Sequence, residues 1–315
     1  MRKKIADTLR IALPVLLFGF ILYTYDMGEV WTHIRNISPI IWIVALLLSL
    51  LLTTLAALRL YIVVGGIKYS SMLYVRLVSS AYGFVLPGFI VAAEGVRIYM
   101  LGKAEGKYSS SSAAVLMDKV IGLIAMLILG VFGLMLAVAF DTRALFIMFL
   151  VGVAGLIVTL LMFMIPLVSK MSVRFLSVLS QKKDPFGKIF GFFLRVLKSW
   201  IEYANNRKIL MGNFVCCFVF HICYVLLGAV LSYGAGAGFL FFDWLWIHAV
   251  LTFAFMLPLS FGAIGLREGA LIWLLGILGV GAEQALAVSF GFLGMQLVFV
   301  LVGFGLEIYV KGRRA

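Results

Sequence analysis

The stretch Leu86-Pro87-Gly88-Phe89-Ile90-Val91-Ala92-Ala93-Glu94-Gly95-Val96-Arg97 interrupts a long apolar run with a proline, two glycines and two charged side chains. A later stretch, Leu257-Pro258-Leu259-Ser260-Phe261-Gly262-Ala263-Ile264-Gly265-Leu266-Arg267-Glu268, has the same order. In both, Leu-Pro comes first and Gly-(Val or Leu)-Arg follows, with a glutamate close by. Because proline lacks a backbone donor and glycine weakens helices, both stretches predict broken helices. The predicted structural breaks are Pro87, Gly88, Gly95, Pro258, Gly262 and Gly265.

The composition places these two stretches in a membrane protein. Hydrophobic residues make up 64% of the 315 residues and charged residues 12%, whereas soluble domains contain about 45–50% and about 25%. Several apolar runs are long enough to cross the hydrocarbon core of a bilayer. We therefore predict an all-α polytopic membrane protein with one domain, 1–315, and about six full transmembrane helices plus two broken or re-entrant helical hairpins.

The apolar runs give the approximate bounds of these elements. The full spans are expected at 9–25, 40–64, 113–140, 144–168, 209–233 and 285–310, and the broken units at 77–101 and 239–281. Basic residues flank 77–101 on both sides, which favours a re-entrant hairpin, whereas 239–281 fits either a re-entrant unit or two short spans. Residues 26–38 are expected to form a loop, and Arg59 and Tyr61 to anchor a helix end at headgroup level.

The net charge of +13 resides in the polar segments between spans. The positive-inside rule explains this distribution, so we expect no nucleic-acid partner, and we expect a location in the cytoplasmic membrane with both termini in the cytoplasm. Residues 169–208 are the most basic segment and are predicted to form a cytoplasmic linker. Within it, 186–203 is typical of an amphipathic surface helix, which anionic lipid headgroups would attract.

The order of elements repeats along the chain. Residues 39–140 and 209–310 each contain a span, a broken unit and a second span, and loop charges give the two halves opposite orientations. This pattern predicts an inverted repeat, in which substrate sites usually lie between the broken elements near the midplane.

Charged side chains inside the apolar segments are the candidate functional residues. Each costs at least about 2.5–3.5 kcal/mol to insert, so such residues usually face a cavity or a partner. Glu94 and Arg97 are spaced to pair on one helix face, although Arg97 also fits an interface anchor, and Asp118 with Lys119 fits an internal ion pair as well as a site. Guanidinium groups suit phosphate because they donate two parallel hydrogen bonds. The candidate substrate-binding residues are Glu94, Arg97, Asp118, Lys119, Ser260, Arg267 and Glu268.

Other polar residues favour structural roles. Glu307 and Lys311 are spaced as an ion pair at a membrane interface, and His221 and His248 fit the core. The three cysteines lie in one apolar segment, without the spacing of a zinc site, and are expected to be buried. The sequence shows no nucleophile–base pairing, so we expect no catalytic residue, metal or cofactor.

Together, these motifs resemble the flippase-like transmembrane domain of lysylphosphatidylglycerol synthases, including stand-alone members without the soluble synthase domain. Two positions depart from the family pattern: Ala92-Ala93 replaces the usual Gly-Gly, and Asp118-Lys119 replaces the usual Asp-Arg. The resemblance covers nearly the whole chain and implies lipid translocation rather than lipid synthesis. The matching residues are Leu86, Pro87, Glu94, Arg97, Asp118, Lys119, Leu257, Pro258, Ser260, Gly265, Arg267, Glu268 and Gly269.

The sequence hypothesis is translocation of an anionic phospholipid or a polyprenyl-phosphate-linked lipid. Arg97 and Arg267 would hold the phosphate, while Glu94 and Glu268 would orient the arginines or contact amino groups. Two alternatives stay open: a membrane-embedded transferase that modifies lipid headgroups or lipid-linked glycans, and a partner subunit for a separate lipid synthase or glycosyltransferase.

Overall fold

The computed structural model describes residues 19–137 and 185–313, except Leu22, Pro87, Gly88 and 257–261, together with isolated positions between 147 and 180. Within these residues the chain is built from helices and their connections. The expected spans at 9–25 and 144–168 lie largely outside the described residues. The helices are α2 (Met27–Asn36), α3 (Pro39–Val64), α4 (Tyr69–Val85), α5 (Phe89–Glu105), α6 (Tyr108–Leu136), α9 (Pro185–Asn205), α10 (Arg207–Gly234), α11 (Phe241–Met256), α12 (Leu266–Gly276) and α13 (Ala282–Gly312).

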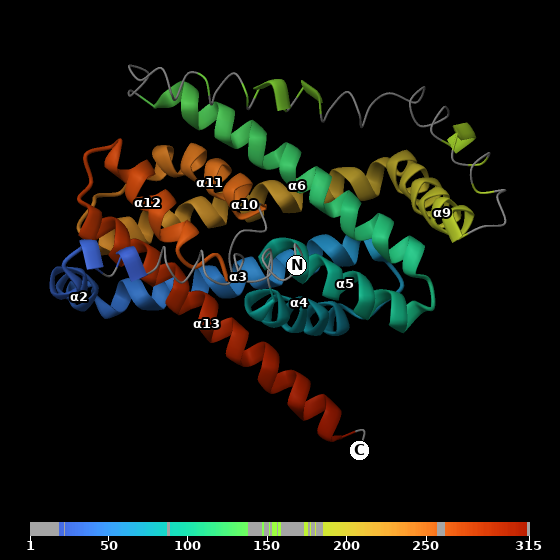
Figure 1. Ribbon diagram of the computed structural model, residues 1–315, viewed down its shortest axis with the longest axis horizontal. Coiled ribbons are helices and arrows are strands. Elements are labelled where there is room, and N and C mark those ends of the chain that lie inside the picture. The colour runs from blue at the N-terminus through green and yellow to red at the C-terminus, as the bar shows by residue number, and fades with distance from the viewer. Residues whose placement is uncertain are drawn as a thin grey trace, which may run out of the picture.

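Four of these helices, α3, α6, α10 and α13, are long and apolar enough to cross a membrane. They correspond to the spans expected at 40–64, 113–140, 209–233 and 285–310, and they confirm that the chain is a polytopic membrane protein. At a rise of about 1.5 Å per residue, each exceeds the thickness of the hydrocarbon core. The helices α3, α6 and α10 follow the long direction of the molecule (Figure 1).

The loop expected at 26–38 was a wrong prediction, because most of this segment is the helix α2. The Asp26 carboxylate caps it by accepting hydrogen bonds from the backbone N–H groups of Gly28, at 2.7 Å, and Glu29, at 3.3 Å. Ser38 then caps α3, whose first residue is Pro39. Asp26 as a cap and Ser38-Pro39 as a cap and first residue are ordinary helix-start signals. The segment is short and polar, so its pattern resembled that of a loop.

The bundle has a basic end and an acidic end. The start of α3 contacts the end of α10, since Ile37 and Ile41 lie against Gly234, whereas the end of α3 contacts the start of α10 through Ile62 and Gly212. The connections beside the end of α3 and the starts of α6 and α10, here called the basic end, carry Lys68, Lys107, Arg207 and Lys208. The opposite, acidic end carries Asp26, Glu29, Asp243 and Glu283 against Arg35.

The two broken units form helical hairpins. Helix α4 packs against α5, and α11 against α12, and the two pairs lie toward opposite ends of the molecule (Figure 1). Residues beside the two tips lie close together, because a Cβ placed on Gly262 would lie 2.6 Å from the Phe84 ring. The tips themselves include Pro87, Gly88 and Pro258, which lie outside the described residues, as does Ser260.

Two glycines with positive φ lie in the turn that precedes α12: Gly262, at 57°, and Gly265, at 81°. Ala263 between them also has a positive φ, 64°, so this turn holds a backbone conformation that side chains disfavour. Gly95, predicted as a break, instead lies inside α5. A single glycine costs a helix only about 1 kcal/mol, which packing against α4 and α6 readily offsets.

Helix α9 covers the segment expected at 186–203. Its C-terminal half packs onto α6 and α10 through Trp200 and Tyr203, and the Tyr203 hydroxyl lies 2.9 Å from Ser110 Oγ. Its N-terminal half exposes Ile189 and Phe193. The C-terminal half of α9 is therefore packed against the bundle, whereas its N-terminal half exposes apolar side chains.

Close contact between α4 and α13 depends on a glycine. A Cβ on Gly303 would lie 2.5 Å from the Leu77 carbonyl oxygen and 3.0 Å from Ala81 Cβ, so the helix backbones must separate to admit it. We expect Gly303→Ala to destabilise the protein by about 1–3 kcal/mol, the usual cost of overpacking. Thermal unfolding in detergent measures this loss. Gly305→Ala on the same helix, which meets nothing within 4 Å, is the matched control, and an equal effect of both would contradict the prediction.

A charged cavity between the two hairpins

A cavity of about 320 Å³ lies between the helices of the two halves. Side chains from α3 to α6 and from α10 to α13 line it, so it draws on both predicted repeats. Among the charged groups that line it, cations outnumber carboxylates by five to two. The cations are Arg59, Arg76, Arg97, Lys119 and Arg267, and the carboxylates are Glu94 and Asp118.

Glu94 and Arg97 form the ion pair that their spacing predicts. Arg97 Nη1 donates to Glu94 Oε2 at 2.6 Å, and the Lys119 ammonium binds the other carboxylate oxygen at 2.8 Å. Lys119 thus pairs with Glu94 and not with its neighbour Asp118. Arg97 is only 4% exposed, and its Nε and Nη2 atoms find no hydrogen-bond partner among the described residues. Two strong donors of a cavity-lining residue are therefore buried and unpaired among the described residues.

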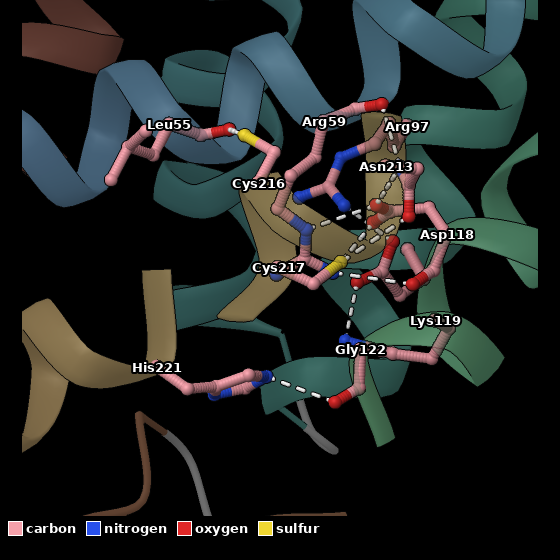
Figure 2. A network of polar contacts seen from close by, with 11 residues as sticks. Leu55, Arg59, Arg97, Asp118, Lys119, Gly122, Asn213, Cys216, Cys217 and His221 are labelled. Atoms are coloured by element: carbon pink, nitrogen blue, oxygen red, sulfur yellow. Dashed lines mark hydrogen bonds and ion pairs between the residues drawn. The ribbon is translucent and has the colours of Figure 1, made fainter. Parts of the chain in front are cut away.

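Asp118 belongs to a second network, shown in Figure 2. Arg59 donates from Nε and Nη2 to the two Asp118 carboxylate oxygens, at 3.0 and 3.1 Å, in a two-pronged ion pair. The buried Asn213 amide donates to Asp118 Oδ1 at 3.0 Å and to the Arg59 carbonyl oxygen at 2.8 Å. Three membrane-spanning helices, α3, α6 and α10, thus meet at one polar centre. The prediction that Arg59 anchors a helix end at the interface was wrong, because this buried pair holds it inside.

In the second motif, each guanidinium nitrogen of Arg267 has a hydrogen-bond partner. Arg267 donates to Glu268, Ser289 and Gln296 at 3.0–3.2 Å. The other Glu268 oxygen accepts from the Gly265 backbone N–H at 2.6 Å, which ties the network to the turn before α12. Because Gln296 Oε1 faces Arg267, its amide nitrogen is left buried without a partner among the described residues. The second network therefore contains a buried, unpaired amide donor on a residue that lines the cavity.

Two cavity residues escaped the sequence analysis. Arg76 belongs to the basic flank that precedes 77–101 in the sequence, but it lies in α4 and lines the cavity, and no carboxylate pairs with it within the described part of the chain. Gln296 lies in the apolar α13 and is neutral, so a search for charged residues in apolar segments does not find it. The helical pattern of Ser79, Ser80 and Arg76, one turn apart, is the signal that would have placed Arg76 on the polar face of a helix.

The residues expected to be structural behave as follows. Cys216, Cys217 and Cys223 are buried and free, as predicted, and Glu307 forms the predicted ion pair with Lys311, at 2.6 Å. His221 and His248 are buried and also line the cavity. Within the described residues, no three His, Cys, Asp or Glu side chains gather closely enough to hold a metal ion.

The remaining walls of the cavity are apolar. Leucine, methionine and phenylalanine side chains surround the charged centre, among them Leu52, Leu77, Leu123, Met126, Phe255 and Phe299. A cavity that joins excess positive charge to apolar walls suits a ligand with an anionic head and a hydrocarbon body.

Comparison with known proteins gives one family. The family model described as the lysylphosphatidylglycerol synthase TM region matches residues 8–303. This range contains every helix that lines the cavity, apart from the last residues of α13. Neither the curated proteins nor the solved structures gave a significant match.

Proposed function

Because the chain belongs to the lysylphosphatidylglycerol synthase transmembrane-region family, we propose that it moves an anionic lipid between the leaflets of the cytoplasmic membrane. The substrate is a phospholipid or a polyprenyl-phosphate-linked lipid. Its phosphate enters the charged cavity, and its hydrocarbon chains follow the apolar walls.

The unpaired donors of Arg97 carry this proposal. A buried guanidinium with unpaired nitrogens is costly, because each lost hydrogen bond of a charged group is worth about 1.5–3 kcal/mol. Glu94 accepts from Arg97 only at Nη1 and shares its carboxylate with Lys119, and Nε and Nη2 stay unpaired among the described residues. A phosphate beside Arg97 would accept from Nε and Nη2 together, in the forked geometry that guanidinium groups favour. Arg76, without a carboxylate partner among the described residues, lines the same cavity.

The motion that we propose uses the two halves as inverted repeats, 39–140 and 209–310. Each half contributes a hairpin, α4–α5 or α11–α12, that enters from its own face of the membrane and turns back near the midplane. Two observations support this arrangement: the hairpins lie toward opposite ends of the molecule (Figure 1), and Phe84, beside one tip, lies close to Gly262, beside the other. Rocking of one half against the other would expose the cavity alternately to each leaflet.

The charges at the helix ends support one orientation. The basic end faces the cytoplasm according to the positive-inside rule, which also places the C-terminal Lys311 and Arg313 there. Helix α9 then lies along the cytoplasmic surface, where its exposed Ile189 and Phe193 enter the headgroup layer. Anionic lipid headgroups would attract its basic side chains and supply substrate close to the cavity.

A sided assay with reconstituted vesicles tests this function. Phosphatidylglycerol and phosphatidylcholine, each with a fluorescent label on an acyl chain so that its headgroup is unchanged, are incorporated, and the fraction that a membrane-impermeant quencher reaches is followed over time. We expect protein-dependent movement of the anionic lipid at least about tenfold faster than that of the zwitterionic lipid, since one charge-assisted interaction is worth that ratio.

Two results would contradict the proposal. Equal rates for both lipids would remove the role of the cationic cavity. Static lipid together with a modified lipid product, formed from a labelled headgroup donor, would favour the transferase alternative. Vesicles that contain inactivated protein provide the control for leakage.

A further inference from the structure

The cavity contains a pair of histidines that the lipid-binding proposal does not use. His221 on α10 and His248 on α11 are 6% and 5% exposed, and both line the cavity. His221 Nδ1 lies 2.8 Å from His248 Nε2, and His221 Nε2 lies 3.0 Å from the Gly122 carbonyl oxygen on α6. Figure 2 shows the contact between His221 and Gly122. Two imidazoles at this distance share one hydrogen bond and so constrain each other's protons.

The hydrogen bonds assign the proton positions in the neutral pair. A carbonyl oxygen only accepts, so His221 Nε2 carries a hydrogen and donates to Gly122. A neutral imidazole has one N–H, so His221 Nδ1 must accept, and His248 Nε2 donates to it. His248 Nδ1 is then the only ring nitrogen of the pair with a free lone pair. The Thr252 hydroxyl, 3.5 Å away, already donates to the His248 carbonyl oxygen, so its own lone pairs face this nitrogen.

In the neutral histidine pair, His248 Nδ1 is therefore the one atom that can accept an added proton. A proton from water that binds there creates an imidazolium, whose new N–H points toward Thr252 Oγ1. The existing Nε2–H can then shift to His221 Nδ1, which spreads the charge over both rings without changing the contact to Gly122. Tyr224 stacks on His248 with 4.1 Å between ring centroids, and Phe292 stacks on Tyr224. These rings limit access to the pair from its other sides.

Burial of both rings and the charged groups around them together decide when the pair accepts a proton. From α6 and α3 it faces Lys119 and the Arg59–Asp118 pair, from α12 the Arg267–Glu268 pair, and from α13 only the neutral Gln296 and Phe292. The hairpin α4–α5 adds Arg76, Arg97 and Glu94. With Glu268 counted beside Arg267, five cations meet three carboxylates, so a ligand-free cavity has excess positive charge and repels a further proton.

We propose that His221 and His248 form a proton-binding site that fills when an anionic lipid headgroup occupies the cavity. This inference rests on the proposed function. A phosphodiester adds one negative charge to the cavity and so offsets part of the excess positive charge, which together with burial of both rings disfavours an added proton. By linkage, proton and lipid each strengthen the binding of the other by the same factor. The lipid anion thus travels with a proton, and a transmembrane proton gradient can drive its movement.

Binding of phosphatidylglycerol to the purified protein in nanodiscs, measured by calorimetry between about pH 5.5 and about pH 8, tests this site. A phosphodiester keeps its charge over this range, so the pH dependence belongs to the protein. We expect the wild type to bind up to about tenfold more tightly per pH unit lowered. We also expect it to take up protons when lipid is added in weakly buffered solution with a pH indicator.

The variants separate the pair from the rest of the protein. His248→Gln keeps an N–H that can donate to His221 but cannot titrate, so the ratio of affinities at the two pH values is expected to fall to one. His221→Gln tests the same loss from the other ring. His33→Gln on α2, outside the cavity, replaces the third histidine of the chain and is expected to keep the wild-type ratio.

Each contrary outcome identifies the step that fails. Lipid binding that is independent of pH in the wild type, without proton uptake, would overturn the proton site and leave the lipid-binding proposal standing. A wild-type pH ratio in both His248→Gln and His221→Gln would overturn the assignment to this pair. If phosphatidylglycerol does not bind at any pH, the proposed function itself fails, and with it the inference that depends on it.

Discussion

Replacement of Arg97 by glutamine is expected to slow translocation of phosphatidylglycerol by about 100-fold or more. The variant removes Nε and Nη2, the two buried unpaired donors that we propose bind the lipid phosphate. Two charge-assisted hydrogen bonds at about 1.5–3 kcal/mol each account for this loss, because about 1.4 kcal/mol corresponds to a factor of ten. The sided vesicle assay measures it. Arg97→Lys keeps the charge without the fork and is expected to lie between the wild type and Arg97→Gln.

The contacts around Arg97 indicate that Arg97→Gln tests function without disrupting the fold. Glu94 keeps Lys119 as its counter-ion, at 2.8 Å, so Arg97→Gln does not leave a buried carboxylate unpaired. Folding is checked by gel filtration and thermal unfolding in detergent. Arg35→Gln, which removes the same charge from the exposed face of α2, is the matched control. A wild-type rate in Arg97→Gln would refute the role of Arg97 in holding phosphate.

Features that depend on neighbours in the sequence were predictable. Apolar runs located α3, α6, α10 and α13, because length and hydropathy alone decide whether a helix suits a membrane. The Leu-Pro motifs located the two hairpins, since proline and glycine act on their own backbone. The pairs Glu94–Arg97 and Glu307–Lys311 followed from helical spacing.

Features that depend on distant contacts were not predictable in the same way. Asp118 lies beside Lys119 in the sequence, but its partners, Arg59 and Asn213, come from other helices. Helical geometry explains why: consecutive residues point in different directions, so Lys119 turns toward Glu94 on α5. The unpaired amide nitrogen of Gln296 arises only because Arg267 from α12 engages its oxygen. Packing between helices thus decides which donors and acceptors in the cavity pair with one another. A single sequence carries little information about this packing.

Stability is expected to depend most strongly on the pair Arg59–Asp118. Asp118→Asn keeps an oxygen that can accept from Asn213 but removes the charge opposite Arg59. Loss of one partner from a buried pair costs about 3–5 kcal/mol, because the remaining charge is left buried without compensation. Denaturation of the purified protein by increasing SDS, followed by helical circular dichroism, measures the loss. Glu29→Gln, at an exposed pair with His33, is the control and is expected to cost less than about 1 kcal/mol.

A double-mutant cycle distinguishes the ion pair from mere packing. Arg59→Met removes the guanidinium while it keeps an unbranched apolar chain beside Phe220, whose ring centroid lies 5.0 Å from Arg59 Cζ. If the pair stabilises α3 against α6 through charge, Arg59→Met combined with Asp118→Asn is less destabilising than the sum of the single changes, by about 2–3 kcal/mol. This excess arises because neither buried charge remains in the double variant. Strictly additive losses would show that the two side chains act independently, and a wild-type stability of Asp118→Asn would show that the ion pair contributes no net stability.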